Sequence, residues 1–275
     1  MVKASKVVLG IAGNSPGYLN QTGESRALDK VEDTRLPRAL FPIYAENYEQ
    51  SYLAQYPFSD SRLQLPEQSD AKVQMEPELA LKLKVQYRAS GEVQSLAPIA
   101  LGLINDATHR NKTIDKLVQK KNWGASSKGI SVSWLPIPEF EPALNHLRLC
   151  GFLNRGGEWY LCSQDVSVVD YHLFFEPLLD WIAERINSQQ DEGALHDIKA
   201  ILQGCNRPAE ITVAIGAPCY TDLGESHYLQ QGDETLAIAY DSRELSFGEI
   251  EQALAHGDVS KLSKSKLYLH QQVAG

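Results

Sequence analysis

The sequence predicts an α+β fold, a mixed β-roll or distorted barrel with peripheral helices. Two observations predict it. Residues 73–87 alternate apolar and polar side chains without a break, as in a strand that buries one face. Strand-like and helix-like segments then follow one another without the strand–helix–strand period of a parallel sheet. No internal repeat or low-complexity segment stands out.

The charge and composition of the chain exclude several classes of function. A net charge of −9, with no basic tract to offset it, argues against nucleic acid as a partner. No apolar run approaches the roughly 20 residues that span a bilayer, so we expect no membrane segment. The short apolar segment at 7–11 predicts a first strand rather than part of a signal peptide. The four cysteines are widely spaced and form no CxxC pair, which predicts reduced thiols and a cytoplasmic protein.

The expected elements follow from periodicity, caps and turn residues. Strands are predicted at 7–11, 74–87, 96–104, 129–137, 211–218 and 235–241, with a hairpin over 147–162 that turns at 155–157. Helices are predicted at 114–121, 171–187 and 194–203, and Ser246 with Glu249 forms a capping box for another that ends near 256. Residues 25–66 are expected to be irregular. The basic cluster KLVQKK at 116–121 is expected on the exposed face of its helix.

The strand at 74–87 starts with two glutamates around a proline. Side chains two residues apart in a strand point the same way, about 7 Å apart, so Glu76 and Glu78 share one face. Pro77 has no N–H to donate, which predicts an edge, a bulge or the start of the strand. Taken alone, the commoner interpretation is a solvated face that Lys82 and Lys84 continue. The other interpretation is a pair of metal-binding carboxylates.

A third carboxylate stands at the end of another predicted strand. Asp106 follows the apolar run 96–104, where it is either a turn or cap residue or a functional group. Oxygen atoms from Glu76, Glu78 and Asp106 would suit a hard cation such as Mg²⁺ or Mn²⁺. The spacing is compatible with such a site.

The order of these segments resembles the fumarylacetoacetate hydrolase family along most of the chain. GIAGNSPGYLNQTGE resembles the family's first strand and active-site loop, and FPIYAEN with RLQLPEQ resembles the connection into the metal strand. VQMEPELALKLKV resembles its ExELA strand, IALGLINDATHR its NDxSxRD segment, NWGASSKGIS its Lys-Gly/Ser-Phe-Asp segment, and ITVAIGAP with YLQQGDE its closing GTP…PGD turn. The resemblance implies one domain over 1–275. Residues 1–66 would supply the first strand, the active-site loop and the irregular segment, and 67–275 the metal-binding core.

The resemblance also assigns site residues. It makes Glu76, Glu78 and Asp106 the ligands of Mg²⁺ or Mn²⁺, which overturns the solvated-face interpretation. Lys128 matches the family's lysine near the metal, where an ammonium would stabilise charge that develops on a carbonyl oxygen and where burial would lower its pKa. Arg110 matches the arginine of NDxSxRD. The alternative for Lys128 is an ordinary loop lysine. The alternative for Arg110 is a structural ion-pair partner.

The chain departs from the family pattern at the residues that activate water. Hydrolytic and decarboxylating members carry a His and a Glu three residues apart in the first loop, and the matching positions here are Tyr18 and Gln21. A tyrosine pKa is about 10, and a glutamine amide only orients groups by hydrogen bonding. Ser131 and Ala217 replace an Asp and a Thr of the pattern. His109 is the nearest histidine in sequence to the metal segment, although a lone His in a polar segment is more often a surface residue.

Three functions follow from these observations. The first is a divalent-metal-dependent enzyme that acts on a small oxo-acid or β-dicarbonyl compound. It would cleave a C–C bond, decarboxylate or isomerise its substrate through a metal-chelated enolate. Without the dyad, isomerisation or enol–keto exchange is easier to defend than hydrolysis. The second is a non-catalytic, metal-dependent binding or regulatory relative that takes a dicarboxylate or similar metabolite. The third is a structural protein whose carboxylates lie on the surface. The resemblance also implies a homodimer. The aromatic-rich stretch 40–58 would supply either its interface or a lid over the site.

Overall fold

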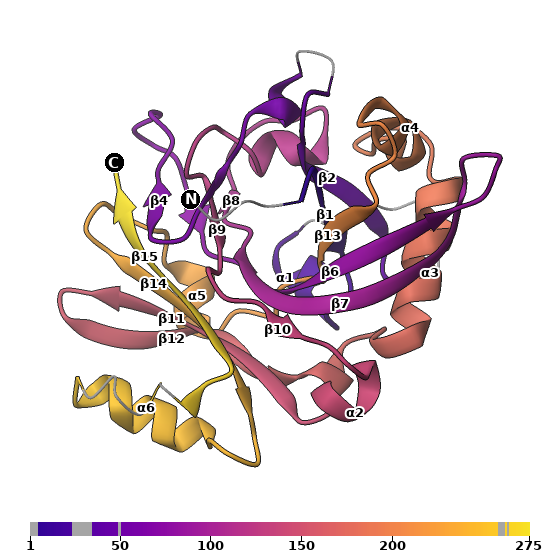
Figure 1. Cartoon of the computed structure of the whole chain (residues 1–275). Helices are drawn as coiled ribbons and strands as arrows, with labels where there is room; N and C mark the ends of the chain where they lie inside the picture. Colours follow the sequence, from indigo (N-terminus) through magenta and orange to yellow (C-terminus); the bar gives the residue numbers. More distant parts are fainter. Residues whose placement is uncertain (1–4, 24–34, 49–50, 258–261, 263) are drawn as a thin grey trace.

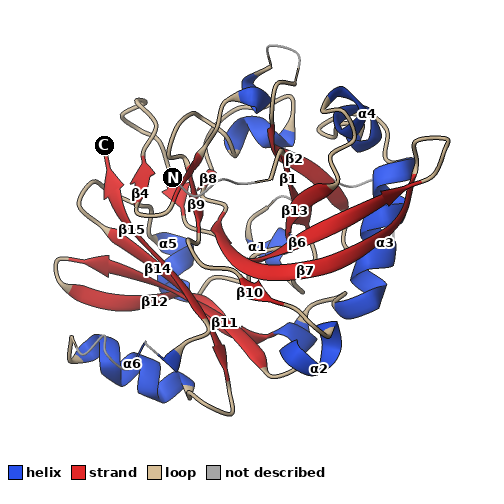
Figure 2. Cartoon of the chain, viewed as in Figure 1, coloured by secondary structure: helices blue, strands red, loops and turns tan. Residues whose placement is uncertain are grey.

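The computed structural model describes residues 5–23, 35–48, 51–257, 262 and 264–275 (Figure 1). The described strands form three sheets, with helices around them (Figure 2). The eight-stranded sheet has the order β2 (Ala39–Ala45), β1 (Val7–Ala12), β13 (Glu210–Ala214), β6 (Pro77–Tyr87), β7 (Val93–Asn105), β9 (Lys128–Ile130) and β3 (Phe58–Ser59), with β10 (Leu135–Pro136) beside β7. The five-stranded sheet has the order β12 (Glu158–Ser167), β11 (Leu147–Arg155), β14 (Glu234–Asp241), β15 (Leu267–Ala274) and β4 (Arg62–Gln64), and β5 (Val73–Gln74) pairs with β8 (Thr108–His109).

The helices are short except for one. They are α1 (Tyr18–Gln21), α2 (Phe140–Leu144), α3 (Phe175–Ser188), α4 (Ile198–Gly204), α5 (Asp222–Ser226) and α6 (Phe247–Ala255), with 3₁₀ turns η2 (Tyr52–Ala54), η3 (Leu117–Lys120) and η4 (Val168–Asp170). Within the described ranges, no helix is long and apolar enough to span a bilayer.

The eight-stranded sheet mixes parallel and antiparallel pairs. Strands β1 and β13 run parallel, although they lie about two hundred positions apart in the chain, with Val8 opposite Thr212. Strand β6 is antiparallel to both of its neighbours, β13 and β7. The sheet therefore places β6 in its middle, with β13, β1 and β2 on one side and β7, β9 and β3 on the other.

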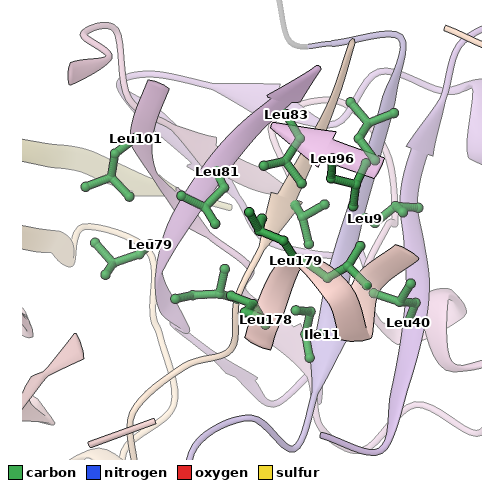
Figure 3. Close-up of a cluster of buried hydrophobic side chains, with 14 of the residues drawn as sticks. Leu9, Ile11, Leu40, Leu79, Leu81, Leu83, Leu96, Leu101, Leu178 and Leu179 are labelled. Carbon is green, nitrogen blue, oxygen red and sulfur yellow. The ribbon is translucent and has the colours of Figure 1, made fainter. Parts of the chain in front are cut away.

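The main core lies between the two large sheets and α3. Most of its members come from β1, β2, β6, β7 and β13 of the first sheet, from β11, β14 and β15 of the second, and from α3 and α4. Each fully buried leucine here contributes about 1.5–3 kcal/mol to the free energy of unfolding. Figure 3 shows this cluster around Leu9, Ile11, Leu40, Leu79, Leu81, Leu83, Leu96, Leu101, Leu178 and Leu179.

The opposite face of the eight-stranded sheet carries a second, smaller core. Ala80 and Ile104 point into it from β6 and β7, and Tyr18, Phe41 and Leu117 cover it from α1, β2 and η3. Both faces of β6 are therefore buried at its first half, and only its second half exposes alternate side chains. Glu76 and Glu78 are buried as well, which excludes the solvated-face interpretation of this strand.

The α+β prediction is confirmed, and most predicted elements are present. The hairpin turns at 156–157, Ser246 and Glu249 form the capping box of α6, and Pro77 is the first residue of β6. All four cysteines are free thiols. The predicted helix at 194–203 begins later, at Ile198, where Asp197 caps it.

Three predictions about local structure are wrong. The segment 129–137 is not one strand but β9 and β10 with a bend between them. The segment 114–121 contains only the 3₁₀ turn η3. Residues 25–66 are not irregular throughout, because they contain β2, whose seven residues are all buried; the residues of 40–58 that belong to β2 are core rather than lid. Residues 24–34 and 49–50 of that stretch lie outside the described part.

A glycine in α5 tests how tightly this fold is packed. A Cβ on Gly224 would lie 1.9 Å from the carbonyl oxygen of Cys162 in β12, whereas a Cβ on Gly248 in α6 would meet nothing within 4 Å. We expect Gly224→Ala to lower the free energy of unfolding by about 1–3 kcal/mol. The control Gly248→Ala should raise it by roughly 0.5–1 kcal/mol. Urea unfolding followed by tryptophan fluorescence measures both, and an unchanged Gly224→Ala midpoint would contradict the packing described here.

Candidate metal centre

Three carboxylates meet where β6 begins and β7 ends. The antiparallel register places Pro77 opposite Asn105 and Glu78 opposite Ile104. Just outside this ladder, the backbone N–H of Asp106 donates to the carbonyl of Glu76 at 2.8 Å. The side chains of Glu76, Glu78 and Asp106 each offer one oxygen within 4.8 Å of the others, and none is more than 2% exposed.

Cations from three other segments contact two of these carboxylates, Glu76 and Asp106. Glu76 is paired with Arg110 at 2.8 Å and with Lys121 at 2.6 Å. Asp106 is paired with Lys121 at 2.7 Å and with Lys128 at 3.1 Å. Lys128 reaches this place because β9 is antiparallel to β7, with Gly129 opposite Asn105. The cluster thus contains three carboxylates and three cationic side chains.

The surroundings shift the pKa values of the cluster in different directions. Burial opposes the ionisation of Glu76, but the charges of Lys121 and Arg110 outweigh it and lower its pKa to about 2. Burial and the neighbouring charge of Asp106 raise the pKa of Glu78 well above its ordinary value. Burial lowers the pKa of Lys128 to about 8, with the charge of Lys121 adding to the effect and that of Asp106 opposing it.

The donor set fits a divalent cation. Both oxygens of Asp106 are buried and accept no hydrogen bond of good geometry, although two ammonium groups lie nearby. Glu78 accepts a hydrogen bond from the backbone N–H of Gly216 at 2.7 Å and has no cation in contact among the described residues. Carboxylate oxygens are the ligands that Mg²⁺ and Mn²⁺ prefer.

Lys121 is the residue of this site that the sequence prediction missed. It was expected on an exposed helix face, but its side chain is only 4% exposed and lies between Glu76 and Asp106. Lys120 is buried as well. No local pattern separates Lys121 from Lys116, which pairs with Asp191. The charge of three buried carboxylates favours cations nearby, but it does not indicate which lysine supplies one.

Tyr18 and Gln21 both contact Tyr220. The hydroxyl of Tyr18 accepts a hydrogen bond from Arg110 at 2.8 Å and lies 3.5 Å from that of Tyr220. The amide of Gln21 accepts from the N–H of Tyr220 at 2.8 Å and donates to its carbonyl at 3.1 Å. The Tyr220 hydroxyl donates to the carbonyl of Met75 at 2.9 Å. The two residues at the dyad positions therefore connect the first loop to the segment that follows β13.

The interpretation of His109 as a surface residue is wrong. It is 2% exposed, and its ring packs edge-on against Trp123, with centroids 6.4 Å apart. Burial lowers its pKa. The same tryptophan ring lies 4.9 Å from the Lys128 ammonium. Among the described residues, no hydrogen bond or ion pair joins His109 to the three carboxylates.

A small hollow opens onto two of the three carboxylates, Glu76 and Glu78. Its volume is about 20 Å³, and Glu76, Glu78, Lys121, Tyr18 and Phe41 are among the residues that line it. A second hollow of about 70 Å³ shares part of its wall, from the loop between β1 and α1. The larger cleft of about 770 Å³, lined by residues 65–72 and 226–231 with others, includes none of the carboxylates.

Comparison with known proteins places the chain in a family. The sequence model described as "Family of unknown function (DUF5718)" matches residues 26–273. The chain belongs to this family. No curated protein matches this member of DUF5718.

Solved structures show what the DUF5718 fold is similar to. Cg1458 with an inhibitor aligns at 15% identity and a TM-score of 0.58, over 98% of this chain and 77% of that one. The 2-keto-3-deoxy-D-arabinonate dehydratase complexed with magnesium and 2,5-dioxopentanoate aligns at 13% identity and 0.53, over 98% and 73%. The 5-carboxymethyl-2-hydroxymuconate delta-isomerase from Mycobacterium smegmatis aligns at 12% identity and 0.51, over 98% and 79%. The fold is fumarylacetoacetate hydrolase-like, as the sequence predicted.

Asp106 tests whether the charges of this cluster hold the fold together. We expect Asp106→Asn to lower the free energy of unfolding in chelator-treated buffer by about 3–5 kcal/mol, because Lys121 and Lys128 lose a shared buried partner. Urea denaturation measures the change. As a control, Glu184→Gln alters a carboxylate whose side chain is 58% exposed and should change the stability by less than about 0.5 kcal/mol. Equal stabilities for the two variants would argue against a charge-balanced cluster.

Proposed function

We propose that this protein binds a divalent cation, Mg²⁺ or Mn²⁺, through Glu76, Glu78 and Asp106, and that it acts on a small oxo-acid or β-dicarbonyl compound. The observation that carries the proposal is the group of three buried carboxylates, whose ligand atoms lie within 4.8 Å of one another. The buried oxygens of Asp106, which pair with two ammonium groups but accept no hydrogen bond of good geometry, also support it. The similarity in fold to a dehydratase complexed with magnesium and 2,5-dioxopentanoate also supports it.

The residues of the cluster have separate roles in this proposal. The cation, when bound, would polarise the chelated oxo group of the substrate. Lys128 holds fixed positive charge at the Asp106 end of the cluster, which favours an enolate over the neutral ketone. Arg110 holds Glu76 and the hydroxyl of Tyr18 in place. Tyr18 and Lys121 line the hollow and carry protons that a substrate there could exchange.

Isomerisation or enol–keto exchange is the reaction class that we favour over C–C hydrolysis or decarboxylation. Hydrolysis needs a base that activates water. Both ends of the Gln21 amide are hydrogen-bonded to the backbone of Tyr220. This side chain therefore has a structural role at the position where the family's hydrolytic members carry the Glu. His109 lies against Trp123 and is not bonded to the carboxylates. Proton transfer to and from an enolate requires no activated water.

A metal-dependent binding or regulatory protein is the second candidate function. The engaged Gln21 amide favours it, and so does the small volume of the hollow beside the carboxylates. In either case the proposed partner is a small oxo-acid or dicarboxylate. A homodimer and a cytoplasmic location stay predictions.

Proton exchange distinguishes the two candidates. An enzyme of the proposed class should exchange the hydrogens next to the oxo group of oxaloacetate or an acylpyruvate for deuterium, in a reaction that needs Mg²⁺ or Mn²⁺ and stops with chelator. NMR in D₂O follows the exchange. A binding protein should instead bind Mn²⁺ more tightly with oxalate, an enolate mimic, in calorimetry while exchange stays at the background rate.

Glu78 tests the metal assignment directly. Glu78→Gln keeps an acceptor for the N–H of Gly216 but removes a charged ligand, so we expect Mn²⁺ affinity to fall about 100-fold or more. The circular dichroism spectrum should not change. The matched control is Glu210→Gln, an exposed glutamate on the neighbouring strand β13, which should bind Mn²⁺ as the wild type does. Retained affinity in Glu78→Gln would rule out the assigned site.

Introducing the family's His/Glu dyad tests the proposal that this site does not activate water. A glutamate at position 21 would lie near the carboxylate of Glu225, which Gln21 contacts at 3.2 Å. We therefore expect cleavage of oxaloacetate or an acylpyruvate from Tyr18→His/Gln21→Glu combined with Glu225→Gln, and less from the double variant, in which like charges meet. A coupled assay for pyruvate measures oxaloacetate cleavage. No cleavage by the triple variant would mean that the site differs by more than the dyad.

A further inference from the structure

Lys121 already places a positive charge where a metal ion would bind. Its ammonium lies 2.6 Å from Oε2 of Glu76 and 2.7 Å from Oδ2 of Asp106, so it bridges two of the three carboxylates. An ion bound through that oxygen of Glu76 at about 2.1 Å would lie no more than about 5 Å from the ammonium. Two positive charges at that separation in a buried site repel each other strongly.

The cluster contains as many cationic side chains as carboxylates. Glu76, Glu78 and Asp106 supply three negative charges when ionised, and the contacting cations supply three positive charges. A divalent ion would leave the cluster with an excess positive charge unless one cation moves away or an anionic substrate enters. Lys121 is the cation that can leave, because it lines the hollow together with Glu76 and Glu78.

We propose that Lys121 is a tethered competitor for the metal position: its ammonium occupies the site in the resting protein, and a divalent ion binds by displacing it. This inference rests on the proposed function, since it concerns the same three carboxylates. It predicts that the wild-type chain binds the ion more weakly than its carboxylates alone would allow.

The structure also indicates how Lys121 would move. The next residue, Asn122, donates to the carbonyls of Ile43 and Gln55 at 3.2 and 3.1 Å, which fixes the backbone, so the side chain moves alone. The Lys121 ammonium lies 5.3 Å from the centre of the Phe41 ring, which lines the same hollow. The face of an aromatic ring attracts a cation, so this contact already belongs to the resting position of the ammonium.

Lys128 is not an equivalent competitor. It contacts Asp106 but neither glutamate, it donates to the backbone carbonyl of Ala107, and its side chain is wholly buried outside the lining of the hollow. Its ammonium also lies against Trp123. An ion that enters through the hollow therefore meets Lys121 first.

The test compares Mn²⁺ binding to metal-stripped full-length proteins. Lys121→Met keeps the length of the side chain without its charge, and Lys121→Gln keeps hydrogen-bond donors for the carboxylates should the first variant fail to fold. The matched control is Lys116→Met, which removes a lysine that precedes η3 and pairs with Asp191 instead. Calorimetry and the electron paramagnetic resonance of free Mn²⁺ give the affinities, and thermal unfolding with and without Mn²⁺ gives an independent readout.

We expect the Lys121 variants to bind Mn²⁺ at least about tenfold more tightly than the wild type, while Lys116→Met binds like the wild type. Without metal the Lys121 variants should melt at a lower temperature than the wild type, and Mn²⁺ should raise their melting temperature more. Equal binding by the wild type and the variants would overturn the inference and leave the proposed function intact. Binding by the variants alone would support the inference and refute metal dependence in the native protein. Binding by none would refute both.

Discussion

The burial of three carboxylates beside one another is the constraint on which the rest of the site depends. Like charges this close cannot all remain ionised in a low-dielectric interior unless cations lie among them. The chain brings its cations from three places that are not adjacent in sequence: Arg110 after β8, Lys121 after η3 and Lys128 at the start of β9. The electrostatics of the carboxylates thus fix the positions of segments that have little regular structure of their own.

A single strand connects this cluster to the main core. Side chains alternate along β6, so the leucines on one side pack into the core between the sheets, while Glu78 and Ala80 point to the other side. The strand begins at Pro77, and the ladder is open just before it, which lets the carbonyl of Glu76 accept from the N–H of Asp106. A change of register by one residue would therefore exchange the carboxylates for leucines, and core packing protects the geometry of the site.

Sequence patterns were sufficient for the features that depend on local order. Strand alternation places Glu76 and Glu78 on one side, and the end of an apolar run places Asp106. Sequence patterns failed where the structure depends on contacts between residues that are far apart in the chain. Strand β2 contains Pro42, which cannot donate in a ladder, and it is tolerated because β2 is an edge strand whose pairing shifts register near Leu9. The burial of Lys121 follows from charge balance, which no local pattern expresses.

The first loop shows why a shared fold does not settle the reaction. At the positions of the water-activating dyad, Gln21 holds the backbone of Tyr220 from both ends of its amide, and Tyr18 shares Arg110 with the hydroxyl of Tyr220. These bonds give the loop a structural role at the point where a base would have to stay free to accept a proton. The carboxylates that suit a cation are meanwhile retained a few ångströms away. In the proposed function, the chain would therefore bind a cation without activating water, and its protons would come from the hydroxyl and ammonium groups around the hollow.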